Sequence, residues 1–537
     1  MREVETIVGL LTVVVVLVML ARRLNVSYPI PLVLGGLALG FVPGLPRVTM
    51  PPDLVLLVFL PPLLYSESLS LSWRDFRANL RPISLLSIGL VAMTTVLVAA
   101  TAHAVVPGLP WAAAFVLGAI VAPTDEVAVA AVAEHLPIPR RLLIIIEAES
   151  LVNDAISLVL YRLAAAAVVT GAFSWLSGGL QFILASVGGV GFGLAVGFGV
   201  NRLRRRLAPD PLTENTISLL TPFLAYLPAE SLHVSGVLAV VATGLYLGRQ
   251  GPRFITSATR LQGGALWRMI DFLLNSLLFI LLGLQLHPIL SRLSGRSWTT
   301  LASEAALVCL CVILSRIVWV IPSAYLPRLL SRRLREQAPL PSWQQIAVVA
   351  WTGIRGGVSL AAALAIPLLT NRGTPFPQRD MLIFLTFAVI LTTLVLQGGT
   401  LPLLIKRLDL KEDDLVSREE TDARLRAARA GLDRLNQIAA SEEVPEEIVA
   451  DLREHVTNRM ERYEARTQGS ANKEYETRAT IYRRLRKEIL MAERETVVGL
   501  RDASAISDDV MLRLQRMLDL EEQRLALEEE GEEGEEE

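Results

Sequence analysis

The sequence predicts an all-α membrane protein of about 13 transmembrane helices with a separate, water-soluble tail. Two observations lead to this fold class. First, 52% of the 537 residues are hydrophobic and only 19% are charged, and the mean hydropathy of +0.47 is higher than soluble proteins show. Second, residues 411–537 carry 21 Lys and Arg against 34 Asp and Glu, whereas residues 1–410 carry 30 against 19. We therefore expect a transmembrane domain at 1–410 and a cytoplasmic helical tail at 411–537.

A helix that crosses the hydrocarbon core of a bilayer needs about 20 mostly apolar residues. Thirteen stretches of this kind follow one another, at 4–21, 28–45, 53–71, 83–106, 111–133, 142–168, 178–201, 214–230, 234–248, 268–288, 300–325, 343–369 and 380–405. The first has Glu3 and Glu5 before it and lacks a basic lead-in and a clear cleavage site. We therefore expect a retained helix and not a signal peptide.

The orientation follows from the basic residues of the short loops, which cluster on the cytoplasmic side of membrane proteins. Every second loop is basic, with Arg22 and Arg23, Arg74, Arg77 and Arg81, Arg140 and Arg141, Arg202–Arg206, Arg249, Arg253 and Arg260, and Arg328, Arg332, Arg333 and Arg335. An odd number of spans then puts the N-terminus outside the cell membrane and the tail in the cytoplasm.

Two of the spans are interrupted in the middle. In the fifth, Pro123 removes a backbone donor, and the polar residues Thr124, Asp125 and Glu126 follow it. In the twelfth, the stretch "WTGIRGGVSL" places three glycines around Arg355. Spans one to six and eight to thirteen, taken as inverted repeats around the seventh, put both breaks at the fifth place. Such pairs of discontinuous helices are typical of secondary transporters. The alternative is an ordinary packed helix with a Pro or Gly kink.

The sixth span carries three carboxylates in an apolar stretch. A carboxylate at the centre of a bilayer is costly, so it faces protein or a water-filled cavity and needs partners. Helical spacing puts Asp154 on one face with Ser150, Ser157 and Glu147, while Glu149 and Asn153 lie on a neighbouring face. Oxygen ligands without Cys or His suit a hard monovalent cation or a proton and argue against a transition-metal site.

These motifs resemble the NhaP-type sodium/proton antiporters, a monovalent cation/proton antiporter family related to the sodium/proton exchangers. The resemblance rests on "PTD" at 123–125, "ESLVND" at 149–154 and "GIRGG" at 353–357. It extends to "LPPLLY" at 60–65, "FLLNSLLFILLG" at 272–283 and "LSRIVWV" at 314–320. The resemblance implies a homodimer, in which each protomer has a dimerisation domain and a mobile core domain where the two discontinuous helices cross.

The resemblance also assigns roles to residues. Asp154 is implied as the carboxylate that binds Na⁺ and protons in turn, with Thr124, Asp125 and Ser150 as further ligands. Asn153 matches the Asn of the family's Asn-Asp pair, which implies electroneutral one-for-one exchange. The physical reason is that Asn cannot titrate, so that one cation and one proton compete for a single negative charge.

Two arginines lie inside predicted spans. Arg316 is alone in the apolar eleventh span and needs a partner, and the resemblance implies a structural ion pair with Glu149. Arg355, at the break of the twelfth span, is expected to offset the carbonyl ends of the half-helices and Asp125. The alternative for Arg355 is a side chain that reaches to the cytoplasmic surface.

The chain departs from the family pattern at Glu126, where many relatives have Pro, and at "EAES" in place of "EGES", which sets Glu147 before Ala148. These carboxylates, together with Glu67 just after "LPPLLYS", are possible accessory ligands. For Glu67 the alternative is a residue at the inner end of the third span. Asp271 and Asn275 in the tenth span are expected to tie helices together.

The sequence of the tail predicts helices followed by a flexible acidic strip. "SREE" at 417–420 fits a capping box, Ser507 fits an N-cap of an amphipathic helix, and the final acidic run repels itself. We expect this tail to regulate transport or to contribute to the dimer; the alternative is a solvated appendage. Cys309 and Cys311 are expected to serve as small hydrophobic residues, without disulfide or metal chemistry.

The function predicted from sequence is exchange of a monovalent cation, Na⁺ or else Li⁺ or K⁺, for H⁺ in sodium and pH homeostasis. No phosphate-binding loop or nucleophile arrangement occurs, which argues against an enzyme, and we expect no cofactor and no nucleic-acid partner. The alternative function is a cation channel or a membrane sensor that signals through its tail.

Overall fold

The computed structural model describes residues 2–24, 27–42, 52–126, 129, 138–171, 175–206, 210–251, 255–293, 295–330, 341–408, 414–467, 473–503, 505 and 507–533. Regular structure in these ranges is helical, apart from one isolated β-bridge between Leu369 and Pro375. The predicted all-α class is thus confirmed. The chain divides into two compact units, Met1–Glu412 and Asp413–Glu537.

The first unit consists of long helices and of shorter helices that adjoin breaks. They are α1 (Arg2–Arg23), α2 (Pro29–Gly40), α3 (Pro52–Ser70), α4 (Trp73–Ala78), α5 (Leu80–Ser84), π-helix η1 (Leu85–Leu90), α6 (Val91–Val105), α7 (Trp111–Val121), α9 (Arg140–Thr170), α10 (Trp175–Arg204), α11 (Pro211–Ser231), α12 (Gly236–Gln250), α13 (Ser257–Arg292), α14 (Trp298–Leu330), α16 (Trp343–Trp351), α17 (Gly357–Leu364), α18 (Arg379–Thr392), π-helix η3 (Thr393–Gly398) and α19 (Gly399–Leu408).

Five helical stretches among the described residues are long and apolar enough to cross a bilayer: Leu80–Val105, Gly178–Arg204, Ser257–Arg292, Trp298–Leu326 and Arg379–Leu408. Shorter apolar helices accompany them at Pro29–Gly40, Leu56–Ser70 and Trp111–Val121. The number of thirteen spans and the inverted repeats remain predictions.

Local sequence explains where several of these helices begin. Asp210, Ser235 and Thr256 each accept a hydrogen bond from the backbone N–H three residues ahead, so each caps a helix N-terminus. Ser342 caps α16, and the side chain of Gln345 returns a bond to the Ser342 backbone, which makes a capping box. These caps satisfy backbone donors that a helix start leaves without partners.

The helices of the first unit pack in two groups. One, which we call the scaffold group, contains α1, α2, α3, α10, α11, α12 and α13. The other, the crossing group, contains α4, α5, η1, α6, α7, α9, α14, α16, α17, α18, η3 and α19. The seam between the groups is formed mainly where α3, α10, α12 and α13 meet α9, α17 and α18.

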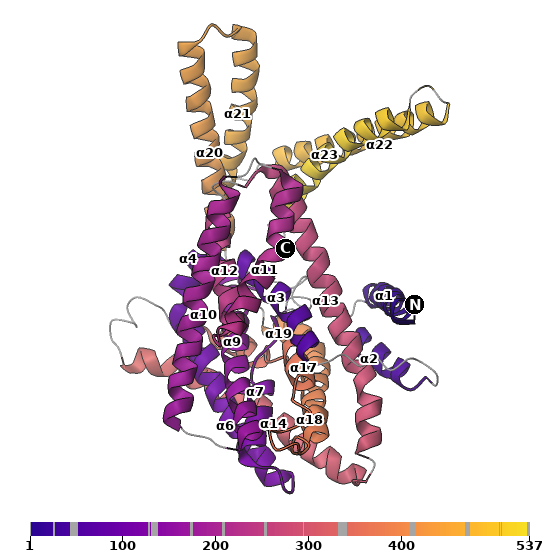
Figure 1. Ribbon diagram of the computed structural model, residues 1–537. Coiled ribbons are helices and arrows are strands. Elements are labelled where there is room, and N and C mark those ends of the chain that lie inside the picture. Colours follow the sequence, from indigo (N-terminus) through magenta and orange to yellow (C-terminus); the bar gives the residue numbers. More distant parts are fainter. Residues whose placement is uncertain are drawn as a thin grey trace. The chain divides into compact units, whose positions relative to one another are not determined.

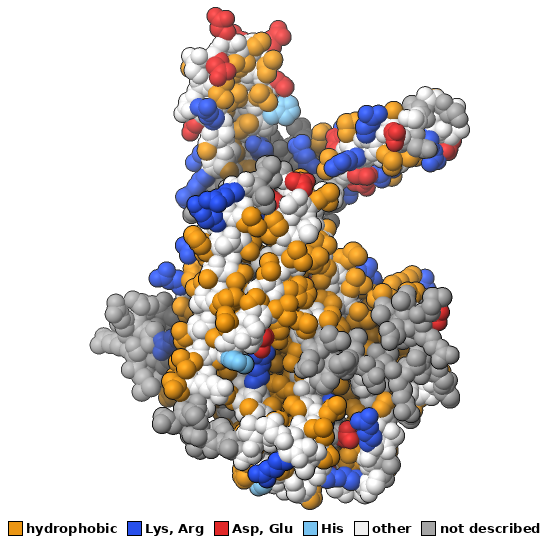
Figure 2. Space-filling view, viewed as in Figure 1, with side chains coloured by type: hydrophobic (Ala, Val, Ile, Leu, Met, Phe, Trp, Pro, Cys, Tyr) orange, Lys and Arg blue, Asp and Glu red, His pale blue; other side chains and the backbone are white. Residues whose placement is uncertain are grey.

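Apolar side chains cover much of the visible face of the first unit, where charged side chains are sparse (Figure 2). Helix α10 shows the pattern clearly, because Leu180, Ile183, Leu184, Val187 and Phe198 are all exposed. A row of exposed leucine, isoleucine, valine and phenylalanine side chains along a long helix would be unfavourable in water and is favourable in lipid.

The second unit consists of two helical hairpins, α20 (Asp414–Ser441) with α21 (Glu446–Thr467) and α22 (Lys473–Asp502) with α23 (Asp508–Glu533) (Figure 1). Ion pairs join the partners of each hairpin, such as Arg429 with Glu464 at 2.6 Å and Arg494 with Asp519 at 2.6 Å. Each is exposed and contributes little individually.

Two details of the tail differ from prediction. The capping box at Ser417 is wrong, because α20 already begins at Asp414 and runs through Ser417. The acidic strip is helical as far as Glu533, since glutamate has a high helix propensity and adding residues to an existing helix is easier than starting one. Ser507 does cap α23, accepting a bond from the Val510 N–H.

Candidate ion-binding site at the helix crossing

Two interrupted chain segments meet in the crossing group. Helix α7 ends at Val121, and residues 122–125 are not helical; α16 ends at Trp351, and α17 begins at Gly357. The N–H of Asp125 donates a hydrogen bond to the carbonyl of Ile354 at 2.8 Å. The two unwound segments are therefore paired through their backbones. The remainder of the predicted fifth span, apart from Glu126 and Val129, lies outside the described residues.

Charged side chains complement the helix ends at this crossing. Nε of Arg355 donates to the carbonyl of Val121 at 3.0 Å, and its Nη1 donates to the carbonyl of Gly353. Both acceptors lie at C-terminal ends of half-helices, where partial negative charge accumulates. The N-terminus of a helix carries the opposite, positive partial charge. At the N-terminus of α17, Oδ2 of Asp125 accepts a hydrogen bond from the Gly357 N–H at 3.2 Å. Arg355 is fully buried, so the alternative of a surface arginine is wrong.

Glycine is required at position 356 because the two segments approach so closely. A Cβ atom built on Gly356 would lie 1.4 Å from Oδ2 of Asp125. The same construction on Gly357 meets only the end of the Leu278 side chain, at 2.8 Å. The first contact involves a carboxylate that is itself hydrogen-bonded to the backbone, whereas the second involves a flexible methyl group. The crossing geometry therefore requires a glycine at position 356, whereas position 357 has room for a methyl group if the Leu278 side chain moves slightly.

Helix α9 holds the unwound segment at Thr124 from two sides. Oγ of Ser150 donates to the Thr124 carbonyl at 2.8 Å, and Nδ2 of Asn153 donates to the Thr124 hydroxyl at 2.9 Å. All three residues are buried. Ser150 and Asn153 thus fix both the backbone and the side chain of Thr124. Asp154 lies next to Asn153 on the same helix, one turn after Ser150.

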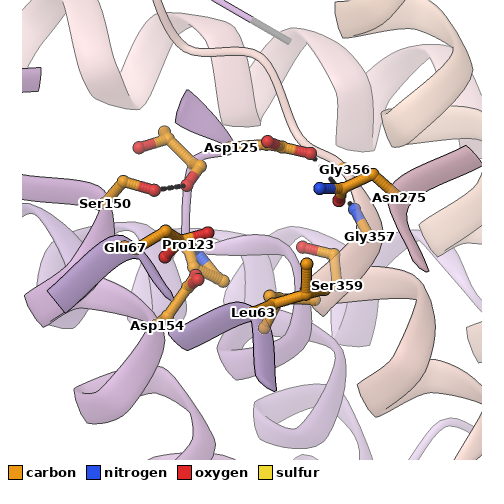
Figure 3. A pocket seen from close by; sticks show the side chains of 12 residues that line it. Leu63, Glu67, Pro123, Asp125, Ser150, Asp154, Asn275, Gly356, Gly357 and Ser359 are labelled. Atoms are coloured by element: carbon orange, nitrogen blue, oxygen red, sulfur yellow. Dashed lines mark hydrogen bonds between the residues drawn. The ribbon is translucent and has the colours of Figure 1, made fainter. Parts of the chain in front are cut away.

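A small cavity lies between this assembly and the scaffold group. It is lined by Leu63, Glu67, Pro123, Thr124, Asp125, Ser150, Asp154, Asn275, Gly356, Gly357, Val358 and Ser359 (Figure 3). Its volume is about 20 Å³, and one water molecule needs roughly 10–15 Å³ by the same measure. The cavity therefore has room for an object of the size of a water molecule or a bare monovalent cation.

Carboxylates enter this cavity from both helix groups. Asp154, which is only 4% exposed, comes from α9, and Glu67 comes from α3 of the scaffold group (Figure 3). Among the described residues, Oε2 of Glu67 is buried without a hydrogen-bond partner. A buried carboxylate oxygen without a donor is a place where a proton or a cation can bind. Carboxylate, hydroxyl and carbonyl oxygens around one small space suit a hard cation.

The predicted structural pair lies beside the cavity, in the core of the crossing group. Nη1 and Nη2 of Arg316 donate to Oε1 and Oε2 of Glu149 at 2.5 and 3.0 Å, and Nε donates to the carbonyl of Val349 at 2.9 Å. Both residues are fully buried. The pair ties α9 to α14, and the third bond extends the tie to α16.

The other residues that the sequence placed near the site do not all reach the cavity. Of the possible accessory residues, Glu67 lines the cavity, whereas Glu147 is exposed and outside its lining, so the column of oxygens expected on α9 does not extend that far. The Ser157 hydroxyl also turns away, because it bonds to the carbonyl of Asp154 in its own helix. Glu126 is half-buried beside the unwound segment but does not line the cavity.

The sequence analysis does not assign two of the polar lining residues to the site. Asn275 was expected only to tie helices, and Ser359 was not singled out, yet both line the cavity. The tie itself is made by Asp271, whose Oδ2 accepts a hydrogen bond from Ser66 at 2.5 Å. The signal for Asn275 was its polar side chain in the middle of an apolar span; Ser359 gave a weaker one, three residues after the double glycine.

Comparison with known proteins places the chain in a family. The family model described as "Sodium/hydrogen exchanger, transmembrane" matches residues 9–407. The chain belongs to this family. It is therefore a multi-pass membrane protein that carries out cation/proton antiport, and the sequence-based resemblance to NhaP-type antiporters is confirmed.

The chain is similar in sequence to several curated proteins and in fold to a solved structure. An uncharacterized Na(+)/H(+) exchanger of Mycobacterium tuberculosis is 40% identical over 97% of this chain and 95% of its own length. A sodium, potassium, lithium and rubidium/H(+) antiporter of Bacillus pumilus is 36% identical over 71% of this chain and 58% of its own length. The structure of the sodium proton antiporter MjNhaP1 from Methanocaldococcus jannaschii at pH 8 has a TM-score of 0.58 at 19% identity, covering 74% of this chain and all of that chain. The exchanger shares its fold.

Proposed function

We propose that this exchanger moves one monovalent cation, Na⁺ in the first place, against one proton through the cavity at the helix crossing. The observation that carries the proposal is the cavity itself, in which Asp154 shares a space of about 20 Å³ with the oxygens of Thr124 and Ser150. Cation and proton compete for the Asp154 carboxylate, so binding of one displaces the other. Thr124, Asp125 and Ser150 supply further oxygens, and Asn153 positions Thr124.

The proposed one-for-one stoichiometry rests on how the carboxylates are distributed. Asp154 is the one carboxylate that α9 contributes to the cavity, and Asn153 beside it cannot titrate. Asp125 is engaged with the Gly357 N–H at the crossing. Glu67 belongs to the scaffold group, so it does not travel with Asp154 if the crossing group moves. One charge then crosses the membrane in each direction per cycle, and transport is electroneutral.

The same proposal includes the finer topology. It comprises thirteen spans in two inverted repeats, an external N-terminus, a cytoplasmic tail at 411–537 that regulates transport, and a homodimer. The loop charges, the two interrupted helices and the family resemblance support these features. The Bacillus pumilus relative is named for exchange of sodium, potassium, lithium and rubidium, which supports including K⁺ and Li⁺ among the candidate ions.

The deciding experiment uses the purified exchanger in sealed vesicles with a pH-sensitive dye inside. An inward gradient of Na⁺ should drive protons out of the vesicles, and the flux should disappear when a large organic cation replaces Na⁺. Parallel gradients of K⁺ and Li⁺ rank the ions. Cation flux that proceeds without proton movement would indicate a channel and would overturn the proposal.

A further inference from the structure

An ion pair connects the two helix groups at a distance from the cavity. Nη1 of Arg162, in α9, donates to Oε1 and Oε2 of Glu230, near the end of α11, at 2.6 and 2.5 Å. Nη2 of Arg162 also donates to the Tyr226 hydroxyl at 3.2 Å. The two charged side chains are 33% and 30% exposed, so the pair lies neither in the core nor free in solvent.

The backbone of α12 completes this arrangement. The N–H of Gly236, the first residue of α12, donates to Oε1 of Glu230 at 2.8 Å. A Cβ atom on Gly236 would lie 2.6 Å from that oxygen and 2.9 Å from the Tyr226 ring. Glu230 is therefore held in one position by a helix N-terminus, and it presents its charge to Arg162 across the seam.

The pair lies on the same helix as the ion-binding carboxylate. Arg162 follows Asp154 by eight residues, which corresponds to roughly 12 Å along α9 and about 80° around it. Arg162 thus lies on a neighbouring face of α9, nearer the C-terminal end of the helix. The proposed topology puts this end outside the cell. The pair therefore joins the two groups on the side of the seam that faces the proposed exterior.

A second ion pair between the scaffold group and the crossing group lies toward the same, proposed outer side. Arg292, the last residue of α13, pairs with Asp380, at the start of α18, at 3.1 Å. In the described part of the chain, these two pairs are the ion pairs that join the scaffold group to the crossing group, and both lie toward the proposed outer side. Arg292 and Asp380 are more exposed, at 60% and 35%, so Arg162 with Glu230 is the stronger tie.

We propose that the Arg162–Glu230 pair is an outer gate of the exchanger, closed in this structure, which has to break each time the ion site opens to the outside. This inference rests on the proposed alternating exposure of the cavity. Its physical basis is that the pair spans two bodies that have to separate there, while the Gly236 N–H holds Glu230 within the scaffold group. Arg162 and Glu230 are positioning residues, because they act through the placement of α9 and do not touch the transported ion.

The test is a reversible cross-link across the seam. Arg162→Cys and Glu230→Cys are combined in a protein with Cys309→Ala and Cys311→Ala, and are joined by a short, reducible bifunctional thiol reagent. Exchange in vesicles should be lost on cross-linking and recovered on reduction. The matched control is Arg296→Cys with Glu304→Cys, a charged pair at 3.3 Å at the start of α14. Since Arg296 lies two residues before α14 and Glu304 lies within α14, this cross-link stays within one short stretch of chain and should leave exchange unchanged.

A second variant separates gating from a structural role. In Glu230→Gln the closed state loses its charge pair, so the site should spend more time open to the outside. The external KM for the cation should then fall several-fold relative to the internal KM. A purely structural tie would lower the maximal rate and the melting temperature without changing this ratio.

The outcomes are distinguishable. Normal exchange in the cross-linked protein, or an unchanged ratio of KM values in Glu230→Gln, would overturn the gate. Absence of cation-driven proton flux in the wild-type chain and the Cys-free parent would instead overturn the proposed function.

Discussion

The buried Glu149–Arg316 pair gives a prediction of large magnitude for stability. In Glu149→Gln, the guanidinium of Arg316 stays fully buried and keeps its bond to the Val349 carbonyl but loses its counter-charge. Breaking a buried pair by removing one partner costs roughly 3–5 kcal/mol, equivalent to a change of about a hundredfold or more in the unfolding equilibrium. We expect Glu149→Gln and Arg316→Ala to lower both the melting temperature in detergent and the amount of protein in the membrane.

The matched control is Arg292→Gln, which breaks the exposed pair with Asp380 and should cost about 1 kcal/mol or less. The double variant Glu149→Leu/Arg316→Met should be more stable than either single variant, because apolar side chains of similar volume often replace a buried pair at little cost. Single variants that unfold like the wild type, or a double variant that is worse than both, would refute this reasoning.

Three further predictions concern the ion site. Asp154→Asn should abolish cation-driven proton flux without unfolding the protein, which circular dichroism and gel filtration would check; surviving exchange would move the site to Asp125. With Asn153 unable to titrate, initial rates in vesicles should be equal at zero and at negative-inside potential, since a net charge moved per cycle would couple by about 2.3 kcal/mol per 100 mV; a clear dependence would exclude the single-carboxylate cycle. Gly356→Ala should reduce exchange by an order of magnitude or more, whereas Gly357→Ala should exchange nearly normally; similar rates in both would show that the Asp125 contact is dispensable.

The sequence predicts well what depends on local chemistry. Pro123 and the glycines around Arg355 indicated the two breaks, because the backbone constraints of proline and glycine act within a few residues. The partner of Arg316 came from the family resemblance. An arginine in an apolar span signals that a partner is needed, but it does not say which one.

Contacts between distant segments were less predictable. Glu67 and Asn275 reach the cavity from α3 and α13, and only the packing of the scaffold group against the crossing group brings them there. Glu147 shows the opposite error: its spacing matched the face of Asp154, but it lies about 10 Å nearer the start of α9, and the side chain is exposed. The pair of Arg162 with Glu230 spans 68 residues of sequence and left no periodic signal.

The backbone bond between Asp125 and Ile354 has a consequence for selectivity. It joins the two unwound segments into one piece, and Ser150 and Asn153 fasten that piece to the helix that carries Asp154. In the proposed cycle, in which the crossing group moves against the scaffold group, a cation bound there takes most of its coordination shell with it from one face of the membrane to the other. The preference among Na⁺, Li⁺ and K⁺ should therefore be nearly the same whether competition is measured from the inside or the outside, with Glu67 and Asn275 as the lining side chains from the stationary group that could make the two rankings differ.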